Sequence, residues 1–575
     1  IPEEHVARAL DVIYDRRTED HDPLAVYIEL FQDVQIISND EEEVDRSLAQ
    51  WLQWHIVEGV RDGLEERLDA AMIEWRPVDV INDHLLAGMK TVGVLFGSGQ
   101  MQLPFVLQSA EVMKRAVAYI EPHLDVDEGE AKGTIVLATV KGDVHDIGKN
   151  LVDIILSNNG WTVHNLGIKQ PIAKIVEAWT ETKADVIGMS GLLVKSVMVM
   201  EENLKVLNDL PKPPAVILGG AALSRYYCES HLRSVYDGSA YYGRDAFDGL
   251  RIANILAAND AAIEESLIDA RLAKRAAVEA QVSASRSQIR EGTTGGDTAV
   301  AVAPARLETV AAPEAPFLGS RVVEAIPLSE VFPFVNEVAL FRGQWGFKKG
   351  ERTAAEYAEH LANDVRPIFD RLAKWAQEEA VLDPKVVYGF FECVSDGDEL
   401  VIFDPQDGSQ ELERFAFPRQ TKRERRSICD YFAPADSGRR DVVGFHCVTV
   451  GTNVSEVARR LFEENEYQEY LFVHGLGVEC AEALAEMWHK RMRAELGIGT
   501  KDSPKIRELF QQKYRGCRYS FGYPACPDMS LQEKLFRLIE PERIGCRLTE
   551  NWQIDPEQST SALVVHHPAA RYFTV

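Results

Sequence analysis

A carboxylate, an imidazole and a glycine follow one apolar run of the sequence. The segment Lys141–Asn150 contains Asp143, His145 and Gly148, and it comes directly after the apolar run 134–138. That run predicts a buried strand and a helix-like pattern follows, which is how a parallel α/β sheet begins; ligands of such sheets bind at the carboxyl ends of the strands. An aspartate that accepts the proton of one imidazole nitrogen leaves the other as a basic metal ligand. A loop histidine is more often a surface or hydrogen-bonding residue, so the spacing alone leaves both interpretations open.

Two later groups of small residues change that balance. Ser190, Gly191 and Leu192 follow the apolar run 186–189, and Gly219 and Gly220 follow the run 215–218. Each group is expected at the end of a strand of the same sheet. Asp-x-His-x-x-Gly, Ser-Gly-Leu and Gly-Gly, in this order, resemble the cobalamin-binding domain in which a protein histidine replaces the cofactor's own base beneath cobalt.

This resemblance implies that His145 binds the cobalt and that Asp143 and Ser196 form a relay with it. The small residues would line the slot for the displaced nucleotide tail, and Gly148 would let the cofactor lie against the backbone. The family often has Thr where this chain has Val194, so a hydroxyl contact is lost. The cofactor-binding residues implied in this domain are Gly142, Asp143, Val144, His145, Asp146, Gly148, Ser190, Leu192, Val194, Gly219, Gly220 and Ala246.

Composition limits the function classes. A chain of 575 residues with 46% hydrophobic content is expected to form three or so folded domains. No apolar segment approaches the ~20 residues of a membrane span, and a net charge of -29 disfavours nucleic acid and anionic membranes as partners. Eight cysteines without a Cys-x-x-Cys pair predict reduced thiols in the cytoplasm, with Cys526 packed in a core. The chain begins at Ile1 without a leader, and we expect it to be a fragment of a longer protein.

Residues 1–124 are expected to form a helical domain. Apolar residues recur at helical spacing, and the acidic run Asp40–Glu43 suits the first turn of a helix. An apolar helix should end at Gly97-x-Gly99 and the next should begin by Pro104, because proline is tolerated in a first turn. The residues that carry the earlier spacing are Val6, Leu10, Ile13, Trp51, Ile56 and Val60.

Phe96 and Leu103 would lie at the elbow between these two helices, where such residues usually belong to a core. The segment also resembles the helical cap that covers the upper face of methylcobalamin in the cobalamin-dependent methionine synthase family. The resemblance implies that Phe96 and Leu103 shield the cobalt–methyl bond. Asn82 stands where the cap often has a glutamate.

The pattern of apolar residues predicts the elements of the remaining domains. Residues 125–258 carry the parallel sheet, with further strands over 161–164 and 240–246 and a structural His164. Residues 259–316 predict an exposed helix followed by a flexible linker. Residues 317–575 predict an α+β domain with strands over 386–391, 399–403 and 442–450 and a helix over 481–491.

The segment Arg518–Pro527 contains two prolines and a glycine and predicts an irregular, extended stretch. Its arginine could grip a carboxylate in bidentate fashion, or the segment could be a rigid structural loop. Arg-x-x-x-Gly-Tyr-Pro-Ala-Cys-Pro resembles the S-adenosylmethionine-binding activation domain of the same family. The resemblance implies that Arg518 binds the methionine carboxylate. The other contacts that it implies are Glu330, Glu482, Ser520, Gly522, Tyr523, Tyr572 and Phe573.

The basic run Arg419–Arg426 is unusual in so acidic a chain. It predicts either a solvated turn or a surface that steers an acidic electron-transfer protein such as flavodoxin.

The sequence therefore predicts a multidomain α and α/β protein: a helical-bundle cap, a Rossmann-like cobalamin domain, a linker and an α+β activation domain. The resemblance implies transfer of a methyl group from methyltetrahydrofolate to homocysteine through methylcobalamin, with reactivation of cob(II)alamin by S-adenosylmethionine and a flavodoxin-like donor. Modules for homocysteine, with its zinc, and for folate are expected outside this chain, which we expect to be a monomer. The alternative is a corrinoid methyl carrier of another methyltransferase system, which would end near residue 260.

Overall fold

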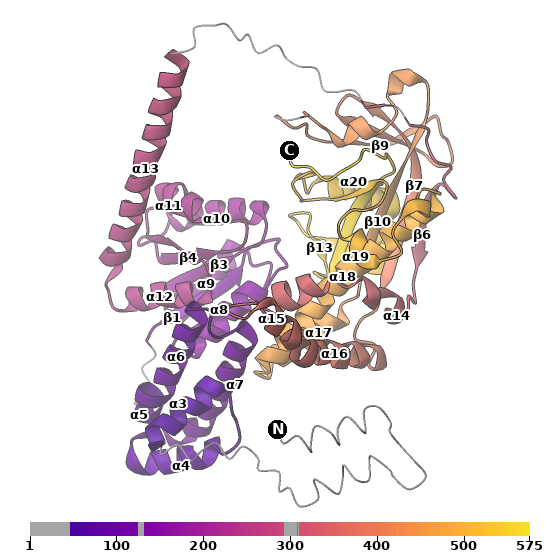
Figure 1. Ribbon diagram of the computed structural model, residues 1–575. Coiled ribbons are helices and arrows are strands. Elements are labelled where there is room, and N and C mark those ends of the chain that lie inside the picture. Colours follow the sequence, from indigo (N-terminus) through magenta and orange to yellow (C-terminus); the bar gives the residue numbers. More distant parts are fainter. Residues whose placement is uncertain (1–45, 125–131, 292–306, 309, 422–423) are drawn as a thin grey trace, which may run out of the picture. The chain divides into compact units, whose positions relative to one another are not determined.

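A computed structural model gives the fold (Figure 1), and it describes residues 46–124, 132–291, 307–308, 310–421 and 424–575. The helices predicted around Val6 to Ile13 and at Asp40–Glu43 lie outside the described residues, as does most of the predicted linker. No helix in these ranges is long and apolar enough to cross a membrane.

The first described domain is helical, as predicted. Its helices are α3 (Leu48–Glu58), α4 (Leu64–Glu74), α5 (Pro77–Asp79), α6 (Leu86–Gly97) and α7 (Leu103–Ile120), with a π-helical turn at Val80–Leu85 and a 3-10 turn at Glu121–His123. Helix α7 begins with Leu103 and Pro104, and it buries Val106, Ala110 and Met113. The predicted break between α6 and α7 therefore lies where the glycines and the proline place it.

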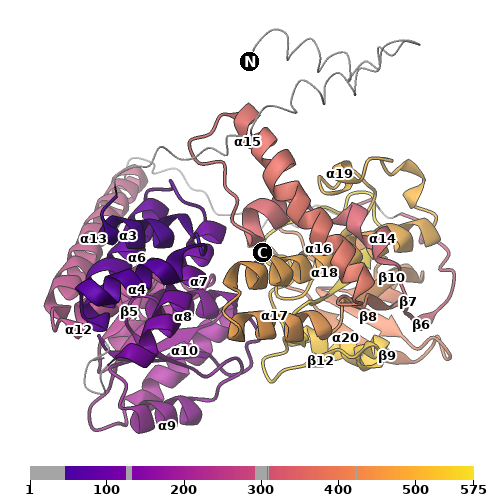
Figure 2. The same cartoon turned by 90° about the horizontal axis from the view of Figure 1, so that it is seen from below.

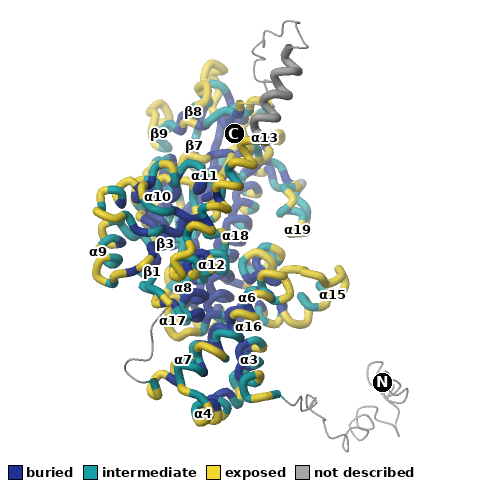
Figure 3. The backbone as a smooth tube through the Cα atoms, turned by 90° about the vertical axis from the view of Figure 1, so that its left-hand side faces the viewer, coloured by how far each residue is buried: buried dark blue, intermediate teal, exposed yellow. Residues whose placement is uncertain are grey.

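The second domain is a five-stranded parallel sheet with the order β2-β1-β3-β4-β5. Its strands are β1 (Thr134–Thr139), β2 (Thr162–Asn165), β3 (Val186–Ser190), β4 (Ala215–Gly219) and β5 (Ala240–Tyr242). The connecting helices are α8 (Ile147–Ser157), α9 (Ile172–Thr182), α10 (Val194–Leu207), α11 (Arg225–Ser230) and α12 (Ala246–Ala257), with a 3-10 turn at Leu232–Val235. The central strands are apolar along their length and buried on both faces, as Figure 3 shows for β3.

The strand order creates a switch point between β1 and β3. The chain leaves β1 toward one side of the sheet and leaves β3 toward the other, so the loops after these two strands diverge at adjacent positions. Thr139 at the end of β1 pairs with Ser190 at the end of β3. This register brings the loop that carries Asp143 next to the loop that precedes Ser196.

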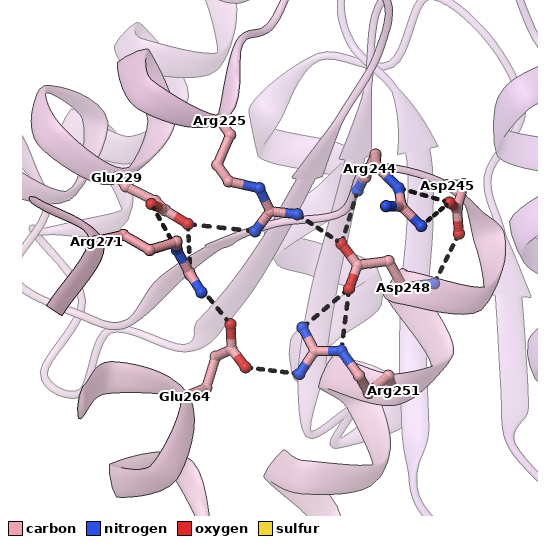
Figure 4. A network of polar contacts seen from close by, with 8 residues as sticks. All are labelled: Arg225, Glu229, Arg244, Asp245, Asp248, Arg251, Glu264 and Arg271. Carbon is pink, nitrogen blue, oxygen red and sulfur yellow. Dashed lines mark hydrogen bonds and ion pairs between the residues drawn. The ribbon is translucent and has the colours of Figure 1, made fainter. Parts of the chain in front are cut away.

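The predicted exposed helix is α13 (Ala261–Glu291). Its first turns are fixed to α11 and α12 by the charge network of Figure 4, in which four arginines alternate with four carboxylates. Arg271 bonds Glu229 at 2.7 Å and Glu264 at 3.3 Å, and Arg251 bonds Glu264 at 2.6 Å and Asp248 at 2.9 Å. The complete set is Arg225, Glu229, Arg244, Asp245, Asp248, Arg251, Glu264 and Arg271.

The third domain is built on a seven-stranded sheet with antiparallel pairing, which confirms the α+β prediction. The order is β11-β14-β10-β7-β8-β9, and β6 also pairs with β7. The strands are β6 (Gly319–Val323), β7 (Lys385–Asp396), β8 (Glu399–Phe403), β9 (Glu411–Ala416), β10 (Asp441–Thr449), β11 (Cys517–Ser520) and β14 (Ser559–Val565). A separate hairpin joins β12 (Arg547–Leu548) to β13 (Ile554–Asp555).

Helices cover this sheet on the side of the long helix α18 (Tyr467–Glu495), and Figure 2 shows α17 (Asn453–Glu463) beside it. The other helices of this domain are α14 (Leu328–Val331), α15 (Ala354–His360), α16 (Arg366–Glu378), α19 (Ile506–Leu509) and α20 (Leu531–Ile539), with π-helical turns at Val338–Gln344 and Leu361–Val365. Two observations differ from expectation. Helix α18 is far longer than the predicted 481–491, and Arg518 belongs to strand β11, so only the residues after Ser520 form the irregular segment.

Candidate functional site

The predicted relay forms at the switch point of the parallel sheet. Asp143 is fully buried, and its Oδ1 accepts hydrogen bonds from His145 Nδ1 at 2.7 Å and from the His145 backbone N–H at 3.0 Å. Its Oδ2 accepts from Ser196 Oγ at 2.5 Å and from the Leu192 N–H at 2.8 Å. Ser196 lies in the first turn of α10, but Leu193 holds the N-cap position, so the hydroxyl serves Asp143 and caps nothing.

This arrangement fixes the histidine tautomer. Burial alone would raise the pKa of Asp143, but the hydrogen bonds from His145 and Ser196 outweigh it and hold that pKa below its usual value. The carboxylate therefore stays charged and accepts the proton of Nδ1. No residue in the described ranges forms a hydrogen bond with Nε2, so the lone pair of this nitrogen is free to bind a metal.

The small residues around the relay have two different explanations. A Cβ at Gly148 would meet nothing within 4 Å, so the space at this glycine, three residues after His145, is open. A Cβ at Gly220, whose φ is +132°, would lie 1.8 Å from Gly191 O, so this glycine is required by close packing of the loops after β3 and β4. A slot for the nucleotide tail along Gly219 and Gly220 stays a prediction.

The other residues predicted here lie on the same edge of the sheet. Leu192 and Val194 are 39% and 71% exposed, and they offer apolar surface beside the relay. Ser190 ends β3, and Ala246 begins α12 behind the N-cap Asp245. Free Nε2, open space at Gly148 and exposed apolar side chains fit a large planar group with a metal at its centre.

The two predicted shielding residues sit in separate environments. The ring of Phe96 lies 5.0 Å from that of Phe247, at the start of α12. Leu103 packs against Gly346, where a Cβ would lie 3.1 Å from the Leu103 Cβ. Asn82 is exposed in the π-helical turn. Their roles above the cofactor stay predictions.

Arg518 lies at the core of the second candidate site. Its Nη2 donates to Glu482 Oε2 at 3.0 Å, and its Nε lies 3.6 Å from Glu486 Oε2. Burial would lower the pKa of Arg518, but these two carboxylates raise it, so the guanidinium is charged. Its Nη1 is buried without a hydrogen-bond partner in the described part of the chain. One side of the guanidinium is thus held by glutamate and the other is available to an incoming carboxylate.

The segment after Arg518 forms a tight turn. The Gly522 N–H donates to Cys526 O at 2.8 Å, and the Cys526 N–H donates to Tyr523 O at 2.8 Å. Gly522 has a φ of +84°, and a Cβ there would lie 2.2 Å from Met529 Sδ, so glycine is required. Cys526 is fully buried, which agrees with its predicted packing role.

Aromatic side chains surround this turn. Tyr572 stacks on Tyr519 at 6.1 Å between ring centroids, and Phe573 contacts the same ring at 5.9 Å. Tyr523 is 52% exposed, and the nearby Glu482 is the main cause that raises its pKa. These residues form an open aromatic wall near Arg518. By contrast, Glu330 is exposed on the short helix α14, and its ligand role stays a prediction.

The basic run is partly neutralised. Arg419 bonds Asp398 at 2.5 Å and Asp430 at 2.7 Å, and its side chain is 19% exposed. It therefore belongs to an internal ion-pair network. Lys422 and Arg423 lie outside the described residues, and the docking interpretation stays a prediction.

Comparisons with known proteins match all three domains. The description "B12 binding domain" matches residues 48–121 and again residues 133–251. The description "Vitamin B12 dependent methionine synthase, activation domain" matches residues 327–575. The chain carries the cap, B12-binding and activation domains of methionine synthase.

Two curated methionine synthases are similar to the chain over its whole length. The protein of Mycobacterium tuberculosis is 46% identical over 605 residues, and that of Mycobacterium leprae is 45% identical over 622 residues. Each alignment covers 100% of this chain and 50% of the relative, so the chain spans about half the length of these relatives. A crystal structure of the MetH reactivation domain bound to AdoHcy is 24% identical, covers 46% of this chain and 83% of that chain, and gives a TM-score of 0.42.

Sequence reasoning missed a set of activation-domain residues that hold the His145 loop. Thr549 Oγ1 donates to Gly142 O at 2.8 Å, Asn551 Nδ2 donates to Lys141 O at 2.6 Å, and the Val144 N–H donates to Gln553 Oε1 at 3.1 Å. A Cβ at Gly142, whose φ is +75°, would lie 2.4 Å from Asn551 Nδ2. The loop that carries the predicted cobalt ligand is thus bound by a segment about 410 residues away in sequence.

Further contacts join the same two domains. Lys169 Nζ pairs with Asp555 Oδ2 at 2.7 Å, and Asn150 Nδ2 donates to the buried Tyr470 Oη at 2.9 Å. An apolar cluster also brings together Leu107 and Ala110 of α7, Ile154 of α8, and Tyr467 and Leu471 of α18. No sequence signal could have found these pairings, because each side chain is unremarkable in its own segment.

Proposed function

We propose that this chain is the cobalamin-carrying and reactivating half of a cobalamin-dependent methionine synthase. It would hold methylcobalamin while a methyl group passes from methyltetrahydrofolate to homocysteine on modules outside this chain. It would also restore inactive cofactor with a methyl group from S-adenosylmethionine and an electron from a flavodoxin-like donor.

The observation that carries this proposal is the Asp143–His145–Ser196 relay. Asp143 holds the Nδ1 proton, which leaves Nε2 as the ring nitrogen available to a metal, and the backbone at Gly148 borders open space. Ser196 and the Leu192 N–H hold the second oxygen of the carboxylate, so the ring cannot swing freely. When bound, cobalamin supplies a cobalt centre that accepts and passes on a methyl group, and His145 would hold the cobalt through Nε2.

In the activation domain, Arg518 would bind the carboxylate of S-adenosylmethionine through Nη1. Glu482 and Glu486 orient the guanidinium from the other side. Tyr523 and Tyr572 offer exposed rings, and the backbone at Gly522, which carries no side chain, could approach the ligand. This pairing distinguishes the proposal from a simple corrinoid carrier, which needs nothing beyond the cap and the B12-binding domain.

The decisive experiment is an absorption spectrum of the cobalamin-loaded chain and of its His145→Gly variant. We expect the variant to bind cofactor but to lose the spectral signature of a lower nitrogen ligand. His164→Gly is the matched control, because His164 lies half-buried in β2 and should leave the spectrum unchanged. An unchanged spectrum in His145→Gly would contradict the ligand role.

We further propose that the chain works as a monomer in the cytoplasm. All eight cysteines are buried free thiols, which supports a reducing compartment. A flavodoxin-like donor is supported only by the resemblance of the activation domain, and mixing experiments with flavodoxin would test it.

A further inference from the structure

Three ligand-type side chains from separate elements converge beside the His145 loop. Asp146 directly precedes α8, His474 lies within α18, and Glu557 lies between β13 and β14. One ligand atom of each side chain lies within 4.8 Å of the other two. His474 Nε2 and Glu557 Oε1 are 3.7 Å apart, which is too long for a hydrogen bond.

His474 and Glu557 lack the hydrogen-bond partners that buried polar groups ordinarily have within a protein. His474 is 3% exposed, and the Glu557 side chain is 14% exposed. Neither of these two side chains makes a hydrogen bond with any residue that the structure describes, whereas Asp146 accepts a hydrogen bond from Asn150 Nδ2 at 3.0 Å. A buried histidine and a largely buried glutamate that make no hydrogen bond within the described part of the chain keep free capacity to bind an ion between them.

The electrostatics of the cluster favour a cation. Burial, together with the negative charges of Asp146 and Asp143, raises the pKa of Glu557 well above its usual range. Burial also lowers the pKa of His474, so its ring is neutral, the form that coordinates metals. A positive ion at the centre would relieve the repulsion among the carboxylates.

We propose that Asp146, His474 and Glu557 form a binding site for one divalent ion of the zinc class, shared between the B12-binding and activation domains. One imidazole and two carboxylates suit Zn²⁺, whereas Ca²⁺ and Mg²⁺ prefer oxygen ligands alone. Zinc–ligand bonds of about 2.1 Å place two ligand atoms of a tetrahedral site roughly 3.4 Å apart. The 3.7 Å separation of His474 and Glu557 therefore needs only a small adjustment, with water completing the coordination.

The site has a consequence for the contact between the two domains. Asp146 comes from the B12-binding domain, and His474 and Glu557 come from the activation domain. Because the ion needs ligands from both, its binding free energy stabilises the state in which the domains are in contact. This inference concerns residues other than the cobalt ligand, so it stands or falls separately from the proposed function.

The test uses the full chain, both without cobalamin and loaded with it. After chelator treatment, each form is dialysed against ZnCl₂, and bound zinc is measured by mass spectrometry of the metal. We expect about one zinc per chain in both forms, bound at least about tenfold more weakly in His474→Ala and Glu557→Gln. His123→Ala is the matched control, because His123 is exposed in the turn after α7 and should leave zinc binding unchanged.

Two outcomes would overturn the proposal. One is equal zinc content in the chain and in both cluster variants, with circular dichroism spectra that show all of them folded. The other is zinc that binds the cobalamin-free chain but is lost on cobalamin loading, because the site would then have no place in the working protein. Glu557→Gln keeps the shape of the side chain, so its zinc content decides the matter even if His474→Ala fails to fold. The eight cysteines are buried and do not compete for the ion.

Discussion

The charge network of Figure 4 and the surroundings of Arg518 differ in how completely their polar groups are paired. In the network of Figure 4, each of the four carboxylates accepts a hydrogen bond from at least one arginine, and the charges balance. Around Arg518 the balance is incomplete: Arg518 Nη1 and Glu486 Oε1 are buried without a hydrogen-bond partner in the described part of the chain. The first region is complete without a ligand, and the second is not.

The pKa values of the carboxyl groups express the same difference. In the network, arginine contacts overcome the effect of burial and lower the pKa of Asp248 and Glu264. At the other sites burial prevails and raises the pKa of Glu486 and Glu557. Saturated ion pairs thus serve as structural supports, whereas buried groups with raised pKa and free hydrogen-bonding capacity mark where a ligand is expected.

The largest effect on stability is expected from Asp143→Ala. The change leaves Ser196 Oγ, His145 Nδ1 and two backbone N–H groups without their shared acceptor in a buried place. We expect a loss of about 3 kcal/mol in the stability of the B12-binding domain, measured as a fall in its thermal unfolding midpoint. Arg244→Ala removes one partner of a network pair whose arginine side chain is 70% exposed, and it should change stability by at most about 0.5 kcal/mol. Equal shifts of the unfolding midpoint in Asp143→Ala and Arg244→Ala would contradict the difference between the ligand sites and the charge network.

Arg518→Ala should weaken S-adenosylmethionine binding by about 2 kcal/mol or more, which is roughly thirtyfold in Kd. The reason is that the carboxylate of S-adenosylmethionine loses the Nη1 donor, while Glu482 and Glu486 lose the cation that they share. Isothermal titration calorimetry measures the affinity, and Arg537→Ala, a surface ion-pair residue, is the control. Cobalamin loading should be normal in both. A parallel loss of cobalamin would indicate misfolding and would remove Arg518 as a ligand-binding residue.

A pH titration separates the two kinds of carboxyl group. Burial and the neighbouring Glu482 raise the pKa of Glu479 to about 7. Since its folded pKa lies above the unfolded value, Glu479 stabilises the fold at low pH, and this contribution is lost as pH rises through about 7. Glu479→Gln does not titrate. We expect the variant to gain about 1–2 kcal/mol in unfolding free energy relative to the wild type between pH 5 and pH 8, measured by urea denaturation. If the difference in unfolding free energy between variant and wild type stayed constant over this range, the pKa of the Glu479 carboxyl would not be raised in the folded state.

The relay could be predicted because its parts obey local rules. Asp143 and His145 are two residues apart in a loop that follows a strand, and Ser196 is assigned through the family resemblance. The register of β1 and β3 explains why Ser196 lies beside them, since strand ends of a parallel sheet meet at one edge. Two prolines and a glycine predict the irregular turn after Ser520, whereas Arg518 is assigned through the family resemblance and its ligand role stays a prediction. By contrast, nothing in the sequence relates His474 or Glu557 to Asp146, since no spacing rule acts across hundreds of residues between domains.

Helix α18 shows how packing overrides propensity. The sequence pattern predicts a helix only over 481–491, and Gly475 and Gly477, each of which costs a helix about 1 kcal/mol relative to alanine, precede that stretch. The helix in fact begins at Tyr467. A Cβ at Gly475 would lie 2.9 Å from the Cβ of Gln344, and one at Gly477 would lie 2.9 Å from Val454, so the glycines allow neighbouring elements to approach the helix. This contact was not visible in the sequence.

The smallest expected effects belong to the saturated network. Arg271→Ala removes one partner from each of Glu229 and Glu264, but Arg225 and Arg251 remain as their other partners. The partly exposed Arg271 side chain should therefore contribute only about 1 kcal/mol, measured as a shift in the unfolding midpoint. Arg225→Ala together with Arg271→Ala leaves the buried Glu229 with no arginine from the network. The double variant should lose more than the sum of the two single losses, by about 0.5–1 kcal/mol. Additive losses would mean that these ion pairs act independently. The network and the Arg518 site would then differ only in how far their side chains are exposed to solvent.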